Sequence, residues 1–176
     1  VKGLENLSET GLKSLLSSNF AIEDEPWTDL TNKSIIKEVQ EILSRENHTF
    51  AIYVADFNKF LILRLKSEDI LDKEINSGKS KEWKRLDIAI LHSLIIDKLE
   101  TFTSEEFSVE NNVNYIRNLE QGIQKVIEGS FQMILLLKPV SLHQIRDIVQ
   151  NGELMPHKST DFYPKLKSGL IINPLS

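Results

Sequence analysis

The strongest helical pattern along the chain lies at residues 33–45. Its apolar side chains recur at the spacing that places them on one face of a helix: Ile35, Ile36, Val39, Ile42 and Leu43. Thr31 or Asn32 is placed to cap the start of this helix. The pattern predicts an amphipathic helix, preceded by a shorter helix at residues 11–17 and by an extended segment that ends at Pro26.

Two apolar runs with strand character follow, at residues 49–55 and 60–66. The residues between them form a linker of hairpin length, with Asp56 and Asn58 suited to a turn. Both sets of alternating positions in these runs are apolar until Arg64. We therefore expect a β-hairpin that is covered on both faces for most of its length.

The second half of the chain alternates between helical and extended patterns. Residues 82–99 are apolar around most of a helical circumference and predict one long, central, buried helix. Residues 113–118 predict a short strand, and residues 119–128 predict a helix that Gly129 ends. Residues 131–139 are almost continuously apolar, which is typical of a strand at the centre of a sheet covered on both faces.

The chain closes with one more helix and one more extended run. Ser141 and Gln144 have the spacing of a capping box, and they begin a helix that Gly152 stops. The run SGLIINPL at residues 168–175 predicts a last strand. Together these elements predict a single domain over residues 1–176 of the α/β class, with α+β as the alternative. We expect a mixed sheet of about five strands, including the hairpin, with helices packed on it.

Composition limits the classes of protein and of site. Of the 176 residues, 40% are hydrophobic and 27% are charged, as in an ordinary globular protein. The absence of cysteine excludes disulfides, thiolate catalysis and cysteine-ligated metal sites. No apolar run is long enough for a membrane helix. We therefore expect a cytoplasmic protein with no membrane association.

The distribution of charge indicates which partners to expect. The net charge of −5 argues against broad nucleic-acid binding, because a phosphate backbone is held by clustered Lys and Arg side chains. Residues 157–176 are an exception, because three lysines outnumber Asp161 there and give a sum of +2, which leaves −7 for the rest of the chain. This basic exception falls on the stretch with the most reactive side chains.

That stretch is MPHKSTDFYPK, residues 155–165. A lysine beside a serine and a threonine supplies one fixed positive charge and two hydroxyl donors, which are groups that hold phosphate or carboxylate. The alternative is structural, with the two prolines stiffening a crossing and the hydroxyls bonding to their own main chain. The side chains predicted to bind an anion are His157, Lys158, Ser159, Thr160, Tyr163 and Lys165.

Residues outside this stretch are weaker candidates. His92 lies on an apolar helical face and is expected to be a buried, hydrogen-bonded histidine. We expect His143 in solvent, and His48 has no acidic partner nearby in the sequence. Arg117 can reach an anion, although an internal ion pair is the commoner use of such a residue. The sequence has no metal-binding motif, so we expect no metal site.

The end of the chain resembles a known family. MPHKSTDFYPKLKSG is similar to the C-terminal signature of a large prokaryotic family of uncharacterised proteins, domain-of-unknown-function family one-thousand-fifteen. Residues 86–99, 113–129 and 131–160 resemble the same family, and residues 50–66 fit its hairpin less specifically. Members of that family have an N-terminal half, with an Asp-Gly-His-His-Arg segment, that is similar to the ParB and sulfiredoxin-like fold. No such segment occurs in this sequence.

The resemblance implies a function for a longer protein. The ParB and sulfiredoxin-like superfamily includes a nucleotide-using free-serine kinase. The chain would then be a C-terminal domain whose loop completes a site shared with the N-terminal half. The implied full-length activity is that of a nucleotide-dependent small-molecule kinase acting on a phosphorylated or carboxylated ligand, with the isolated chain inactive. The alternative is a non-catalytic structural or interaction module with no ligand of its own.

Overall fold

The computed structural model describes residues 1–27, 29–75, 78–103 and 108–159. Four strands form one sheet in the order β1-β3-β2-β4, and every pair is antiparallel. The strands are β1 (Phe20–Glu25), β2 (Thr49–Val54), β3 (Lys59–Leu65) and β4 (Met133–Leu136). The α/β class is confirmed. The described sheet is antiparallel where a mixed sheet was expected, and the strand predicted at 168–175 lies outside the described residues.

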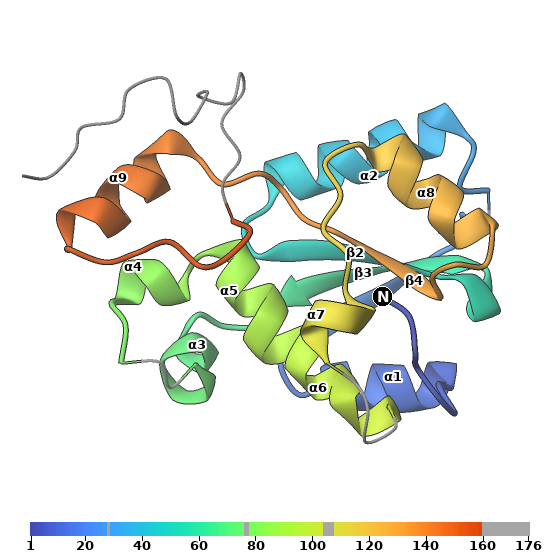
Figure 1. Cartoon of the computed structure of the whole chain (residues 1–176), viewed down its shortest axis with the longest axis horizontal. Coiled ribbons are helices and arrows are strands. Elements are labelled where there is room, and N and C mark those ends of the chain that lie inside the picture. Colours follow the sequence, from blue (N-terminus) through green and yellow to red (C-terminus); the bar gives the residue numbers. More distant parts are fainter. Residues whose placement is uncertain (28, 76–77, 104–107, 160–176) are drawn as a thin grey trace, which may run out of the picture.

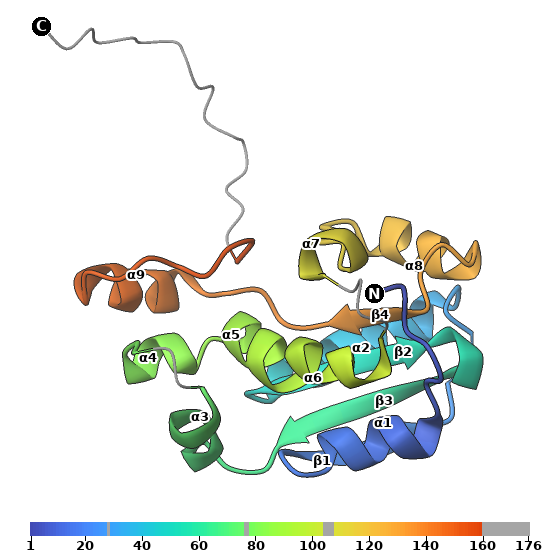
Figure 2. The ribbon, with the colours of Figure 1, turned by 60° about the horizontal axis from the view of Figure 1, so that its bottom comes forward.

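Helices cover both faces of this sheet. Their bounds are α1 (Glu9–Leu16), α2 (Lys33–Arg45), α3 (Asp69–Glu74), α4 (Lys81–Lys84), α5 (Asp87–Leu91), α6 (Asp97–Leu99), α7 (Val109–Asn112), α8 (Leu119–Ile127) and α9 (Leu142–Gln150). Helices α2 and α8 lie on one side of the sheet, and α1, α5 and α6 lie on the other (Figure 1). Figure 2 shows α9 extending away from the sheet beside α4.

Strands β2 and β3 form the predicted hairpin. Tyr53 pairs with Phe60 across it, and a single 3₁₀ turn, Ala55–Phe57, connects the strands. Asn58 then adopts the left-handed conformation with a φ of 50°, which asparagine tolerates better than most residues. Its Oδ1 accepts a hydrogen bond of 2.7 Å from the Tyr53 hydroxyl, so the turn is tied back to the strand.

The two-sided apolar pattern of the hairpin produces two hydrophobic cores. One face of the sheet packs with α1 and the helical segment that begins at α5. The other face packs with α2 and α8. The expectation that the hairpin is covered on both faces is confirmed, since every residue of β2 is buried.

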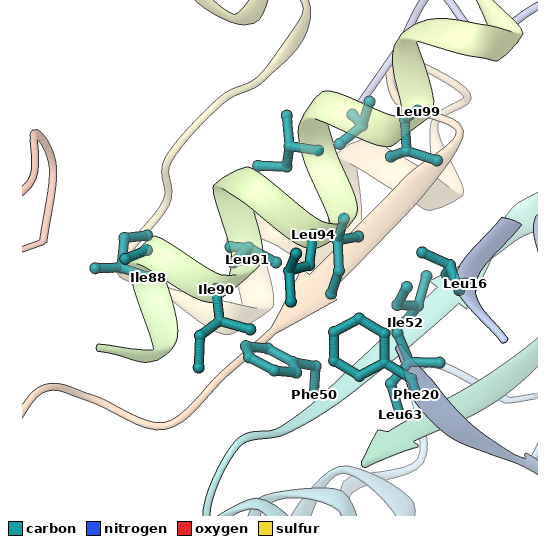
Figure 3. Close-up of a cluster of buried hydrophobic side chains, with 14 of the residues drawn as sticks. Leu16, Phe20, Phe50, Ile52, Leu63, Ile88, Ile90, Leu91, Leu94 and Leu99 are labelled. Atoms are coloured by element: carbon teal, nitrogen blue, oxygen red, sulfur yellow. The ribbon is translucent and has the colours of Figure 1, made fainter. Parts of the chain in front are cut away.

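Aromatic and branched side chains interlock in the first core (Figure 3). The rings of Phe20 and Phe50 meet edge to face, with centroids 5.9 Å apart and an interplanar angle of 88°. Ile52 and Leu63 lie beside them and Leu94 faces them from the helix, all at most 1% exposed. Burying a side chain of this size contributes roughly 1.5–3 kcal/mol, so this face anchors the helix to the sheet.

The prediction of one continuous helix at residues 82–99 is wrong. Helix α4 ends at Lys84, and Leu86 is extended and 1% exposed before α5 begins at Asp87. The main chain then continues through a π-helical turn, His92–Ile96, to α6 and a final 3₁₀ turn, Glu100–Phe102. The apolar pattern runs across the break because the residue at the break is itself buried, so periodicity gave no sign of it.

Two strand predictions in the second half also need correction. Residues 113–118 contain no strand, and Asn118 instead caps α8 by accepting hydrogen bonds from Glu120 and Gln121. Strand β4 lies at the edge of the described sheet instead of at its centre. Its apolar sequence is explained by the two cores, because alternate side chains of β4 pack into each of them.

The predicted helix ends are confirmed where polar caps were recognised. Asn32 caps α2 through a hydrogen bond from Ser34, and Ser141 forms the predicted capping box with Gln144. Gly129 follows α8 with a φ of 74°, a conformation that glycine adopts without strain. Within the described residues, no helix has the length and apolarity that crossing a bilayer requires.

Candidate functional site

A cleft of about 870 Å³ lies along β4 and the residues that follow it. The segment at residues 113–119 and helix α8 also line it, as do the ends of α2 and α5. The last described residues, Lys158 and Ser159, line it too, because the chain after α9 returns toward the start of α5 (Figure 1). The cleft therefore joins parts of the sequence that are far apart.

The charge of the cleft is opposite to the charge of the chain. Four cationic side chains line it, while the lining includes one carboxylate, that of Asp87. The cations are Arg117, Lys125, Lys138 and Lys158. In a chain with a net charge of −5, four cations against one carboxylate make this concavity a local region of positive potential.

The three lysines that line the cleft differ in how their side chains are held. Lys138 donates a hydrogen bond of 2.7 Å to Asn47 Oδ1, which fixes its ammonium group. Lys125 lies over the ring of Phe131, with 5.3 Å between its Nζ and the ring centroid. Lys158 is exposed, and within the described part of the chain it has no acidic partner. Lys158 is therefore the cation with the fewest constraints on reaching a ligand.

The turn that carries Lys158 has the internal bonding expected of a structural crossing. Lys158 has a φ of 62°, in the left-handed region where a lysine is uncommon. The Ser159 hydroxyl donates a hydrogen bond of 2.6 Å to the carbonyl oxygen of Pro156, and the Ser159 amide donates to the same oxygen at 3.4 Å. The serine thus serves its own main chain, as the structural alternative expects, while the lysine stays open to the cleft.

The remaining predicted site residues lie in different places. Arg117 lines the cleft together with Lys158, although the two are far apart in sequence. His157 is exposed, and its side chain is not part of the cleft lining. Thr160, Tyr163 and Lys165 lie outside the described residues.

A tyrosine and a histidine pair at the cleft wall. Tyr115 lines the cleft, and its hydroxyl lies 2.7 Å from His92 Nε2 with the two rings stacked at a centroid distance of 5.8 Å. Burial lowers the pKa of His92, opposed by the negative charge of Asp97, and burial also raises the pKa of the Tyr115 hydroxyl. The hydrogen bond expected for His92 is confirmed, whereas the side chain is half-buried where burial was expected. Its partner comes from the segment wrongly predicted to be a strand.

The carboxylate of the cleft is already engaged. His48 Nδ1 lies 2.8 Å from Asp87 Oδ1, and Asp87 is 8% exposed. On its other side, His48 Nε2 lies 3.6 Å from Glu68, which is itself paired with Arg85. The sequence gave no indication of this chain of contacts, because its members come from separate elements. The imidazole of His48 occupies one side of the Asp87 carboxylate.

The arrangement suits an anion better than a cation. Hydroxyl and amide groups accompany the cations in the lining: Gln40, Ser44, Asn114, Tyr115, Asn118, Gln144 and Ser159. Among the described residues, no group of three or more His, Asp or Glu side chains could hold a metal ion. Apolar side chains make up much of the remaining wall, so charged groups there act in a partly desolvated setting that strengthens their interactions.

Comparisons with known proteins do not assign the chain to a family. No protein-family model, curated protein or solved structure matches the chain. The resemblance of residues 155–169 to the prokaryotic family described above stays a prediction, and so does the function that it implies.

Proposed function

We propose that the cleft binds a small anionic ligand, with a phosphate or carboxylate group held by Lys158 and other cations that line the cleft. The supporting observation is the clustering of four cations against one histidine-paired carboxylate in an otherwise acidic chain. A bond between a lysine and an anionic oxygen contributes about 1.5–3 kcal/mol, so two such contacts already give useful affinity.

The wider proposal concerns a longer protein. In it, this chain supplies one wall of a site that an N-terminal half of ParB and sulfiredoxin-like fold completes, and the full-length protein is a nucleotide-dependent small-molecule kinase. Phosphoryl transfer depends mainly on positioning and on stabilising negative charge, which is work that a lysine-lined and arginine-lined wall can share. We place this activity in the cytoplasm, in keeping with a chain that has no cysteine.

A second candidate function has its own support. The Ser159 hydroxyl bonds to Pro156 and not into the cleft, as expected of a stiffened structural crossing. On this view the chain is a non-catalytic module whose cleft contacts a neighbouring domain and takes up no small ligand. The two candidates differ in whether Lys158 affects ligand binding or only assembly.

A ligand screen tests the anion proposal. Thermal melting of the isolated chain and of the full-length protein would be followed with phosphate, ADP, ATP, serine and phosphoserine, since a ligand that binds the folded state raises the melting temperature. We expect stabilisation by at least one anion, and the stabilisation should weaken as ionic strength rises. If none of them shifts either protein, the non-catalytic module is favoured.

Site variants sharpen the result. Lys158→Ala should weaken the affinity for the anion by roughly 10- to 100-fold, the loss of one charge-assisted contact, while unliganded stability stays within about 0.5 kcal/mol because the side chain is exposed. Lys37→Ala is the matched control, because Lys37 is 78% exposed on α2 and does not line the cleft. Equal affinity in both variants, measured by calorimetric titration, would rule out the proposed role of Lys158.

A further inference from the structure

Strand β4 presents a sheet edge without the usual protection against pairing. Its residues, Met133–Leu136, include no charged side chain and no proline. Strand β1, at the opposite edge of the described sheet, carries the carboxylates of Glu23, Asp24 and Glu25. Edge strands of soluble proteins usually contain such charges or a proline, because an unprotected edge recruits another strand. The edge of β4 is therefore suited to pairing with a further segment.

The main chain of β4 has an unpaired stretch on its outer side. Met133 exchanges two hydrogen bonds with Val1 on that side, its carbonyl oxygen accepting at 2.8 Å and its amide donating at 3.2 Å. Main-chain groups point to alternate sides of a strand, so those of Leu135 and Leu137 face the same way as those of Met133. Within the described residues, no main-chain group pairs with Leu135 or Leu137 on that side. Their amide and carbonyl groups are thus available to a partner strand.

The cleft continues this edge as a slot with apolar walls. Leu91 and Ile96 line it from the helical layer of the first core. Leu119 and Val126 line it from α8, which belongs to the second core. An extended segment beside β4 would therefore be covered on both faces, so it needs apolar side chains at successive positions.

Positive charge at one end of the slot indicates how the occupant ends. Lys158 lines the cleft, is exposed, and has no acidic partner within the described part of the chain. Figures 1 and 2 both show the end of the described chain beside the residues that follow β4. Lys138, two residues beyond β4, also lines the cleft. A carboxylate of the occupant at this end would accept charge-assisted hydrogen bonds.

We propose that the cleft binds the extended C-terminal segment of a partner protein, which adds to β4 as a parallel strand and places its terminal carboxylate beside Lys158. Main-chain hydrogen bonds supply affinity in such strand addition, and pockets for side chains supply specificity. Parallel pairing follows from the charge, since the carboxyl end of the peptide must lie at the carboxyl end of β4. The edge from Leu135 to Lys138 takes about four residues, at roughly 3.3 Å each.

This inference goes beyond the binding of a small anion. A phosphate or a free amino acid needs the cations of the cleft, but it needs neither the unpaired main chain of Leu135 and Leu137 nor apolar walls on both faces. An apolar peptide with a terminal carboxylate uses all three features. Its binding therefore depends on main-chain donors of the peptide, which the binding of a small anion does not.

Synthetic peptides test the proposal on the full chain. The probe is acetyl-Ser-Lys-Val-Ile-Val-Leu with a free C-terminal carboxylate, and calorimetric titration gives its dissociation constant. Two matched peptides carry N-methyl groups on alternate sets of amides, because only one set faces β4 in a paired strand. We expect methylation of one set to weaken binding by at least about tenfold, through lost hydrogen bonds, and methylation of the other set to have a much smaller effect.

A third peptide and a site variant test the charge. Replacing the C-terminal carboxylate by an amide should weaken binding by about tenfold, the loss of one charge-assisted contact. Lys158→Ala should weaken the carboxylate peptide to a similar extent and leave the affinity for the amide peptide unchanged. Lys37→Ala, outside the cleft lining, is the control and should affect neither peptide.

Amide signals in nuclear magnetic resonance spectra locate the bound peptide. We expect the amides of Leu135 and Leu137 to exchange with solvent at least about tenfold more slowly when the peptide is bound, since a paired amide must open before it exchanges. The amides of β1, at the opposite edge of the described sheet, are the control and should keep their exchange rates.

Every other outcome overturns the proposal. Equal affinity of the two methylated peptides would mean that the main chain of β4 takes no part in binding. Slow exchange at Leu135 and Leu137 before any peptide is added would mean that the edge is already paired, by the chain itself or, where protection rises with protein concentration, by a second copy. If no peptide binds but phosphate or phosphoserine still raises the melting temperature, this proposal fails and the anion proposal stands.

Discussion

His92 illustrates how a single half-buried residue responds to its surroundings. Desolvation lowers its pKa from the usual 6.5, the charge of Asp97 opposes this shift, and the Tyr115 hydroxyl can donate to Nε2 only while that nitrogen is unprotonated. Burial and the hydrogen bond both favour the neutral imidazole. The folded state therefore holds His92 neutral at pH values where the unfolded chain has already bound a proton.

We predict that His92 titrates below pH 6.5 in the folded protein. Above that pH the imidazole is neutral in both states and contributes no pH dependence. As the pH falls below 6.5, the unfolded chain binds a proton that the folded state excludes, so this residue lowers the free energy of unfolding until the folded pKa is reached. A nuclear magnetic resonance titration of the imidazole measures the midpoint.

Tyr115→Phe tests the cause of this shift. The variant removes the hydroxyl and keeps most of the burial, so the pKa of His92 should rise toward 6.5 without reaching it. A midpoint at or above 6.5 in the unaltered protein would contradict the lowered pKa of His92. An unchanged midpoint in the variant would assign the shift to burial alone.

Residue pairs were the part of the site that the sequence could not predict. His48 and Asp87 are 39 residues apart, and His92 and Tyr115 are 23 apart. Each pair forms only because separate elements meet, so no local pattern marks it. Residue types, in contrast, were informative. The sequence identified Lys158 and Arg117 as potential anion ligands, and the fold brings both to one cleft.

At the scale of elements, α8 approaches β4 through a glycine. A Cβ atom added at Gly122 would lie 2.9 Å from Cδ1 of Ile134, closer than such atoms approach one another. The close approach is to the end of the Ile134 side chain, and both residues line the cleft. A larger side chain at Gly122 must therefore displace Ile134 or lift the helix from the sheet.

We predict that Gly122→Val lowers the free energy of unfolding by about 1–3 kcal/mol through overpacking. Gln121→Val is the matched control, because it places the same side chain at an exposed neighbouring position and should cost no more than about 0.5–1 kcal/mol. Urea denaturation of both variants measures the difference. Equal losses in the two variants would mean that α8 does not lie against β4 as described.

Elements with strong local signals were predictable, and elements defined by tertiary contacts were not. The spacing of apolar residues and the cap at Asn32 gave the bounds of α2, and turn residues gave the hairpin. The break at Leu86 was hidden because the residue is buried. Residues 113–118 have a short extended pattern but no strand beside them in the described fold, and a strand exists only where it has a partner.

At the scale of the whole molecule, the question is whether the two hydrophobic cores unfold in a single transition. They lie on opposite faces of a shared sheet, and β2 and β3 contribute alternate side chains to each. If β2 and β3 came apart, the side chains that they contribute to both cores would be exposed together. A single cooperative transition is the expected behaviour of such a domain, and each core happens to have its own tryptophan as a reporter.

Trp27 packs against the second core, where its ring meets that of Phe60 at 6.2 Å. Trp83 packs against the first core, and its indole nitrogen donates a hydrogen bond of 3.1 Å to the carbonyl oxygen of Leu154. The chain has two tryptophans, so Trp27→Phe and Trp83→Phe each leave one fluorescent reporter. In each variant, the remaining tryptophan reports on one core.

We predict that, in each variant, the urea midpoint from tryptophan fluorescence equals the midpoint from far-ultraviolet circular dichroism. Comparing two signals within one variant removes the effect of the substitution on overall stability. If Trp83 fluorescence changes at lower urea than the circular dichroism signal, the α4 and α9 region opens before the sheet, and the cleft would lose Lys158 and Ser159 first. Coincident midpoints would instead mean that the cleft persists until the whole fold unfolds, because its walls belong to both cores.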